Sequence, residues 1–280
     1  MDIKAYAKIN IALDIVGKRD DGYHLLRMIM QTIDLYDVVS VSKAKSGIHV
    51  TCNKPYVPVD NRNLAYKAAD IFLDKYKISS GVDINILKNI PVSAGLAGGS
   101  TDAAAVIKIM NKLFDINESS DNLKKLSLSL GADVPYCIEG GTALCEGIGE
   151  IITSLKPFKN RILVLVKPPF GVSTKEVYKK FDLSKVYNHP DIDEIINNME
   201  KNQDGLVYKK MKNLLENVTL RKYKEISEIK IQAMNNDAEG TMMSGSGPTV
   251  FAFFDDMIKA QRFYNKMSCK YKEVYLTRTI

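Results

Sequence analysis

Regular spacing of apolar side chains begins at residues 4–15, KAYAKINIALDI. Apolar residues occupy every second position from Ala5 to Ile15, and polar residues occupy most of the positions between them. This alternation predicts a strand with one apolar face. Because side chains in a strand repeat every second residue, Lys8 and Asn10 point to the same side.

The rest of the chain mixes the spacings of helices and strands. Apolar positions three or four apart predict helices, and alternation or short apolar runs predict strands. The pattern begins afresh after Lys156-Pro157, so we expect two domains, residues 1–156 and 157–280. Helices are expected over 63–76, 100–114, 122–130, 206–220 and 257–267, and strands over 38–41, 48–51, 82–86, 162–166 and 249–254.

Composition indicates a folded globular chain. Its 280 residues are 45% apolar, enough to bury a full core. The formal charge is +6, but the cations are dispersed, which favours solvated helix faces over a nucleic-acid surface. The four cysteines form no C-x-x-C pair, and no apolar run is long enough for a signal peptide or a membrane span. We therefore expect a cytoplasmic protein that binds neither nucleic acid nor membrane.

Residues 91–105, PVSAGLAGGSTDAAA, form a small-residue loop between a predicted strand and a predicted helix. Such a loop collects unpaired backbone N–H groups at a positive helix end, which suits phosphate. A plain tight turn between strand and helix explains it equally well. Ser100 and Thr101 are either N-caps of the helix or hydroxyls that contact phosphate or Mg²⁺. No lysine follows the glycines, so a Walker-type loop is excluded and the cation must come from elsewhere.

The loop resembles the phosphate loop of the GHMP kinases, which also lacks the Walker lysine. Two further stretches are similar to the same family: AYAKINIALDIVGKRDDGYH at 5–24 and MSGSGPTVFAFF at 243–254. The resemblance covers nearly the whole chain. It implies an α+β fold, with an N-terminal nucleotide-binding domain like that of a ribosomal protein and a C-terminal ferredoxin-like α/β sandwich. AKIN, DGYH and GADVPY are most similar to the family branch whose acceptor carries a cytidine diphosphate group.

The resemblance implies transfer of the γ-phosphoryl group of ATP to the 2-hydroxyl of cytidine diphosphate methylerythritol, in the non-mevalonate isoprenoid pathway. In the family, the lysine of the first strand reaches the reacting centre, so Lys8 supplies the missing cation and Asp133 of GADVPY accepts or orients the hydroxyl proton. The residues alone favour a surface lysine on an exposed face for Lys8. Asp133 is equally the N-cap of a short helix with Pro135 in its first turn.

The same resemblance implies contacts to the nucleotide. Asn63 and Lys88 would meet adenine and ribose, although both also suit solvated surface. Ala94 and Ala97 stand where the family often has glycine, and their methyl groups require ordinary backbone angles there. The implied phosphate-binding residues are Pro91, Val92, Ser93, Ala94, Gly95, Leu96, Ala97, Gly98, Gly99, Ser100 and Thr101.

For the acceptor, the resemblance implies that Tyr23 and Tyr178 hold the cytosine ring between them and that His24 meets its polar edge. Asn10 would bond the acceptor beside Lys8. The implied set of acceptor residues is Asn10, Tyr23, His24, Asp133, Thr174, Tyr178 and Gly245. Without the family, DGYH is an exposed turn and Tyr178 is a core ring of a helix. ATP requires Mg²⁺, whose protein ligands the sequence does not identify. A monomer or a homodimer is expected.

Three alternatives stay open at this point. The chain could be another kinase of the family, acting on homoserine, mevalonate or a sugar, although a cytidine clamp is useless to those substrates. It could be a non-catalytic ATP-binding sensor with the same fold. It could also be an RNA-binding protein, since the first domain resembles a ribosomal one.

Overall fold

The structure is a computed structural model that describes all residues, 1–280, and it divides the chain into two compact units. The first unit contains residues 1–7, 35–90 and 97–140, and the second contains residues 8–34, 91–96 and 141–280. The strands β1 (Asp2–Lys18) and β2 (His24–Ala44) pass through both units. The predicted boundary near residue 156 stays a prediction.

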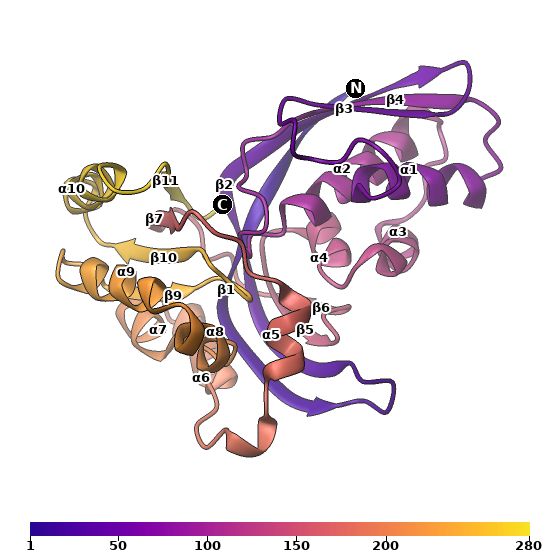
Figure 1. Cartoon of the computed structure of the whole chain (residues 1–280). Coiled ribbons are helices and arrows are strands. Elements are labelled where there is room, and N and C mark those ends of the chain that lie inside the picture. Colours follow the sequence, from indigo (N-terminus) through magenta and orange to yellow (C-terminus); the bar gives the residue numbers. More distant parts are fainter. The chain divides into compact units, whose positions relative to one another are not determined.

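The first unit packs helices on a sheet. β3 (Ile48–Cys52) runs parallel to β4 (Gly81–Leu87), and β4 runs antiparallel to residues 38–44 of β2. Four helices lie beside these strands (Figure 1). They are α1 (Leu64–Lys75), α2 (Gly98–Leu113), α3 (Ser120–Ser127), which continues into a 3₁₀ turn at Leu128–Leu130, and α4 (Val134–Glu139).

The core of the first unit follows from the two spacings. Alternate residues of the strands, such as Val41 and Ile84, face Phe72 of α1 and Ile107 of α2, and all four are at most 1% exposed. Burial of a side chain of this size stabilises the fold by about 1.5 to 3 kcal/mol. The strand and the helix on either side of the glycine loop, β4 and α2, are therefore both anchored in this core.

The second unit contains a four-stranded sheet in the order β11-β7-β10-β9, antiparallel throughout. Its strands are β7 (Ile162–Lys167), β9 (Gly240–Met243), β10 (Val250–Phe254) and β11 (Glu273–Arg278). The helices α9 (Lys224–Met234) and α10 (Met257–Ser268) pack against it (Figure 1). Strand β10 is buried along its whole length, as its unbroken apolar sequence predicts.

The remaining strands of the second unit join β1 and β2, either directly or through β5. β5 (Thr142–Gly147) runs antiparallel to residues 26–31 of β2, and β6 (Ile151–Ser154) pairs with β5. The two-residue strand β8 (Lys212–Asn213) runs parallel to β1 at Ala12 and Leu13. The helices here are α5 (Thr174–Lys180), α6 (Ile192–Glu200), α7 (Asp204–Lys210) and α8 (Glu216–Lys222), with a 3₁₀ turn at Leu183–Lys185.

The mixed helix and sheet composition confirms the predicted α+β class. Helices 63–76 and 257–267 are confirmed within a residue or two, and Asn63 caps α1. The single helix expected over 206–220 is wrong. It is broken into α7 and α8, because Lys212–Asn213 pair with β1 instead of continuing the helix. No helix has the length and apolar character needed to cross a bilayer.

Candidate active site

Lys8 and Asn10 lie side by side on β1, as the strand period predicts. Lys8 is 5% exposed and Asn10 is 1% exposed. The Lys8 Nζ donates a hydrogen bond of 2.9 Å to Asn10 Oδ1, and Asn10 Nδ2 lies 3.6 Å from the sulfur of Met28. Lys8 is therefore not a surface lysine. Because a buried ammonium is costly to desolvate, its position indicates a role for the charge.

The first half of the glycine loop, Pro91–Leu96, lies against β1. The backbone N–H of Lys8 donates to the carbonyl of Leu96 at 3.2 Å. The hydroxyl of Ser244 donates to the carbonyl of Gly95 at 2.9 Å. A Cβ added to Gly95 would lie 2.1 Å from the carbonyl oxygen of Ser244, and the φ of Gly95 is +77°. Only glycine fits this position.

Gly245 brings the third predicted motif to the same place. Its φ is +55°, and its carbonyl accepts a 2.7 Å hydrogen bond from the amide of Asn213. A Cβ at this position would lie 3.3 Å from the Gly95 carbonyl and 3.6 Å from Asn10 Oδ1. Three groups that are far apart in the sequence therefore meet here: the Lys8–Asn10 pair, the first half of the loop and the turn at Gly245.

The second half of the loop begins at Ala97 and enters α2. Ala97 has φ 59° and ψ 26°, so the expectation of ordinary backbone angles is wrong at this residue. Alanine accepts the left-handed region at a cost of about 1 to 2 kcal/mol. Ala97 provides no side-chain cap, which leaves the first amides of α2 without a capping partner. Those amides are the groups that hold phosphate at a helix N-terminus.

Ser100 and Thr101 lie inside the first turn of α2, so the N-cap alternative is wrong for both. The hydroxyl of Thr101 donates to the carbonyl of Tyr6 at 2.8 Å, which ties the helix to the start of β1. Ser100 forms no side-chain hydrogen bond within the chain. The Thr101 hydroxyl is therefore used in a hydrogen bond within the fold, and the Ser100 hydroxyl is available to a ligand.

Lys88 forms a buried triad with two carboxylates, Asp37 and Asp102, and Asp102 belongs to α2. Its Nζ lies 2.5 Å from Asp37 Oδ2 and 2.5 Å from Asp102 Oδ2, and all three side chains are at most 5% exposed. Burial lowers the pKa of Lys88, but attraction to Asp102 and Asp37 outweighs it and the pKa is raised. Lys88 is therefore charged, and it is not solvated surface.

The two carboxylates of the triad differ in their hydrogen bonds. Asp37 Oδ1 accepts from the backbone N–H groups of Asn89 and Ile90, at 2.6 and 2.8 Å. Asp102 Oδ1 is buried and has no partner. Burial raises the pKa of Asp102 to about 7; the Lys88 ammonium opposes this shift and the Asp37 carboxylate adds to it. The raised pKa of Asp102 agrees with its unpartnered oxygen, so Asp102 takes up a proton more readily than an ordinary aspartate.

Asn63 is used locally, since its Oδ1 accepts from the N–H of Ala65 and its Nδ2 donates to the Pro58 carbonyl. The predicted nucleotide contacts of Asn63 and Lys88 stay predictions.

Asp133 occupies the N-cap position of α4, but its side chain makes no capping hydrogen bond. The position expected of Asp133, the N-cap of a short helix with Pro135 in its first turn, is confirmed. Lys8 belongs to the second unit and Asp133 to the first, and the meeting of their side chains stays a prediction.

On the acceptor side, His24 lies against α5. Its ring is 5.3 Å from the ring of Tyr178 and 6.0 Å, edge-on, from that of Phe181. Burial and the nearby charge of Lys18 lower the pKa of His24, so the ring is neutral at pH 7 and has one donor and one acceptor nitrogen. Tyr23 is 60% exposed at the turn before β2. The cytosine clamp stays a prediction.

Thr174 contacts the Gly245 turn, with its hydroxyl 2.8 Å from that of Ser246. Sequence reasoning missed Asp37 and Phe181. An acidic residue inside the apolar run LYDVVSV was the available signal for Asp37, because a charge in such a run needs a buried partner. For Phe181, the signal was its place three residues after Tyr178, directly after the last helical residue, Lys180.

The chain offers little to hold a divalent cation by itself. No group of three or more His, Cys, Asp or Glu side chains is placed to bind a metal. The donor that fits Mg²⁺ is the hydroxyl oxygen of Ser100, a hard ligand at the start of α2. This suits an ion bound mainly by substrate phosphates and water, with one contact from the protein.

Comparison with known proteins agrees with this geometry. The GHMP kinases N terminal domain matches residues 63–141, and the GHMP kinases C terminal domain matches residues 183–273. The 4-diphosphocytidyl-2-C-methyl-D-erythritol kinase of Clostridium botulinum is 69% identical over 100% of both chains, and that of Clostridium beijerinckii is 68% identical, also over 100% of both.

Solved structures agree as well. The crystal structure of a 4-(cytidine 5'-diphospho)-2C-methyl-D-erythritol kinase matches with a TM-score of 0.85 and 29% identity, over 100% of this chain and 99% of that one. Homoserine kinase from Cytophaga hutchinsonii matches with a TM-score of 0.78 and 18% identity, over 99% of this chain and 94% of its own, which shows a shared fold alone. From the two domain matches and the full-length identity, the chain belongs to the GHMP kinase family.

Proposed function

We propose that this protein transfers the γ-phosphoryl group of ATP to the 2-hydroxyl of 4-diphosphocytidyl-2-C-methyl-D-erythritol, in the non-mevalonate route to isoprenoid precursors. The observation that carries the proposal is full-length identity of 69% to a kinase of that name, together with the meeting of Lys8, Gly95 and Gly245. Homoserine and mevalonate kinases match at 16 to 19% identity, which shows a shared fold and does not favour their substrates for this chain.

In this proposal the glycine loop binds the phosphates of ATP. Backbone N–H groups at the start of α2 hold the phosphate oxygens, and the Ser100 hydroxyl contacts phosphate or the Mg²⁺ bound to it. Lys8 stabilises the negative charge that develops on the transferring group, and Asn10 fixes its ammonium. Asp133 accepts or orients the proton of the acceptor hydroxyl. Mg²⁺, when bound with ATP, neutralises phosphate charge.

His24, Tyr178 and Thr174 bind the acceptor in the same proposal. The neutral imidazole of His24 has the donor and the acceptor that a cytosine edge requires, and Tyr178 supplies a ring for the base to stack on. Stacking of this kind contributes about 1 to 3 kcal/mol per base. The contact between the Thr174 and Ser246 hydroxyls, beside the Gly245 turn, supports an acceptor site near Lys8 and Asn10 in the second unit.

A panel of alcohols tests the reaction. The protein is incubated with ATP, Mg²⁺ and, in separate samples, the cytidylyl alcohol, homoserine, mevalonate and galactose, and new phosphomonoester is followed by phosphorus NMR. A signal with the cytidylyl alcohol alone is expected. A signal with homoserine, mevalonate or galactose instead would contradict the proposed substrate, and ATP binding without any transfer would indicate a sensor.

Substitution tests the two assigned side chains. Lys8→Met and Asp133→Ala should each reduce kcat by about a hundredfold or more, because an electrostatic stabiliser or a general base is lost. Dissociation constants for ATP, measured by calorimetry, should change little. Near-normal turnover in either variant would remove that residue from the mechanism.

A further inference from the structure

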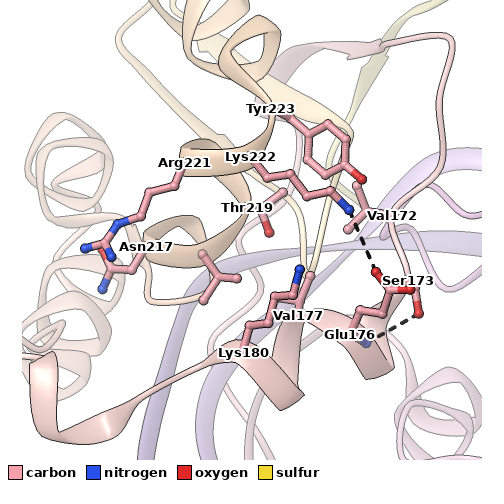
Figure 2. Close-up of a pocket in the computed structure, with 11 residues that line it drawn as sticks. Val172, Ser173, Glu176, Val177, Lys180, Asn217, Thr219, Arg221, Lys222 and Tyr223 are labelled. Carbon is pink, nitrogen blue, oxygen red and sulfur yellow. Dashed lines mark hydrogen bonds and ion pairs between the residues drawn. The ribbon is translucent and has the colours of Figure 1, made fainter.

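The second unit contains a cavity of about 340 Å³ that none of the assigned residues uses. It lies between α5 and α8 (Figure 2). Its volume is in the range of small-molecule binding sites, about 300 to 1,000 Å³. The question is which class of molecule its walls would accept.

The cavity is positively charged. Lys180 of α5 and Arg221 and Lys222 of α8 line it, against one carboxylate, Glu176. Lys222 forms a long ion pair of 3.8 Å with Glu176, whereas Lys180 and Arg221 form no ion pair within the chain. Figure 2 shows the amine of Lys180 directed into the space between the helices. Two cationic side chains are thus left for an anion.

The rest of the wall is apolar and aromatic. Val172 and Val177 are 7% and 5% exposed and form its buried side. The ring of Tyr223 is stacked on Phe170, with centroids 4.7 Å apart and planes 16° apart, so it is held in place. A molecule that suits both parts has an anionic head and an apolar body. A phosphate head suits this cationic wall, because an arginine binds two of its oxygens at once and a lysine adds a point charge.

The cavity and the acceptor residues share one helix. On α5, Glu176, Val177 and Lys180 line the cavity, whereas Thr174 and Tyr178, four residues apart, lie on another face, just before the extended residue Phe181. That second face contacts His24 and Ser246. From α8, Thr219 lines the cavity and donates to the Ser246 carbonyl at 3.3 Å. Both walls of the cavity therefore reach the Gly245 turn.

We propose that the α5–α8 cavity is a second binding site, which takes an organic phosphate with an apolar body and changes the affinity for the acceptor. The predicted change in acceptor affinity rests on the proposed function, whereas binding of the organic phosphate in the cavity does not depend on it. A ligand that fixes α5 against α8 changes the freedom of Thr174 and Tyr178, and this coupling must be reciprocal between the two sites.

The probe is n-hexyl phosphate, titrated by calorimetry into protein saturated with Mg²⁺ and a non-hydrolysable ATP analogue, so that the phosphate loop is occupied. Inorganic phosphate and hexanol are the half-ligand controls, which should each bind at least about tenfold more weakly. The double variant Lys180→Gln/Arg221→Gln should lose about tenfold or more in affinity, because two charge-assisted contacts are removed. Both side chains are exposed, so the fold is retained.

The matched control is Lys179→Gln, an exposed lysine of α5 that does not line the cavity. It should bind hexyl phosphate as the unchanged protein does. Equal affinity of the double variant and the unchanged protein, or no binding at millimolar probe, would overturn the proposal.

Kinetic measurements distinguish a failure of the cavity proposal from a failure of the proposed kinase function. Hexyl phosphate should change the KM for the cytidylyl alcohol in the unchanged protein and leave it unchanged in the double variant. If no alcohol is phosphorylated but cavity binding depends on Lys180 and Arg221, the proposed function fails and the site stands. If transfer occurs normally and acceptor KM ignores bound probe, the coupling is wrong.

Discussion

The two halves of the glycine loop are held by different physical means. Pro91–Leu96 is held by close backbone packing. Gly95 has no side chain, which leaves room for the Ser244 carbonyl, and the Gly95 carbonyl accepts a hydrogen bond from the Ser244 hydroxyl. From Ala97 onward, the loop enters a helix that is held by charge, through Asp102 to Lys88 and Asp37. A loop that binds phosphate has to be rigid, and packing and ion pairing supply that rigidity with different sensitivities. Packing responds to volume, and the triad responds to charge and pH.

The largest effect should follow from removal of the triad's cation. Lys88→Met removes the counter-ion and hydrogen-bond donor shared by two buried carboxyl groups and should lower the free energy of unfolding by about 3 to 5 kcal/mol. Chemical denaturation measures it. The double variant Lys88→Met/Asp102→Asn should recover part of the loss, because it replaces the carboxyl group whose other oxygen has no partner. A single variant as stable as the unchanged protein would show that charge does not hold this half of the loop.

Added volume should affect the first half next most strongly. Gly95→Ala places a methyl group 2.1 Å from a backbone oxygen and forces alanine to φ +77°. Together these should cost about 2 to 4 kcal/mol and weaken ATP binding, as overpacking and backbone strain add. Gly99→Ala is the matched control, since its methyl would lie 3.5 Å from Leu64 at ordinary contact distance. Equal melting temperatures for the two variants would contradict the packing argument.

The two halves of the glycine loop should also differ in how their contribution to stability depends on pH. The folded pKa of Asp102 is raised to about 7 from 3.8, so between about pH 4 and pH 7 the folded state holds a proton that the unfolded state has lost. This bound proton stabilises the folded state fully below pH 4, and the stabilisation is lost as the pH rises to 7. The free energy of unfolding falls by up to about 1.4 kcal/mol per pH unit over this range. Asp102→Asn should remove that slope.

Denaturation of the unchanged protein and Asp102→Asn at pH 5, 6, 7 and 8 gives the comparison. The other ionisable groups that face Asp102 are Lys88 and Asp37, and both remain in the variant. The two stability curves should diverge between pH 5 and 7 and run parallel above about pH 7.5. Parallel curves throughout would mean that Asp102 does not take up the proton.

The smallest effect should come from Ala97→Gly. Relief of the left-handed strain at φ 59° is worth about 1 to 2 kcal/mol, and the added freedom of glycine in the unfolded chain costs about 0.5 to 1 kcal/mol. A net stabilisation of about 0.5 kcal/mol is therefore expected in chemical denaturation. A clear loss of stability would mean that the Ala97 methyl group makes a packing contribution that the strain argument omits.

Sequence patterns predicted the elements that carry strong periodicity. The strand around Lys8, the helix capped by Asn63 and the strand at 250–254 follow from local spacing, because each buries a face that its own residues define. The helix expected over 206–220 failed because a two-residue strand there is specified by its partner on β1, which local spacing does not contain.

The candidate site was predictable only in part, for the same reason. The motifs named Lys8, Asn10, Gly95 and Gly245, and the structure brings these four together. It also gives Lys88 partners that lie 51 and 14 residues away in the chain, which no local pattern reveals. Likewise, the left-handed backbone at Ala97 depends on tertiary context, since alanine by itself avoids that region.

The stacking of Tyr223 on Phe170 has a practical use. The chain contains no tryptophan, so Tyr223→Trp would introduce a single indole fluorophore at the wall of the α5–α8 cavity. A ring system of similar shape keeps the stack and stays next to any molecule that enters. Its emission wavelength would then report on the polarity around that one point, and occupancy could be followed in real time during turnover.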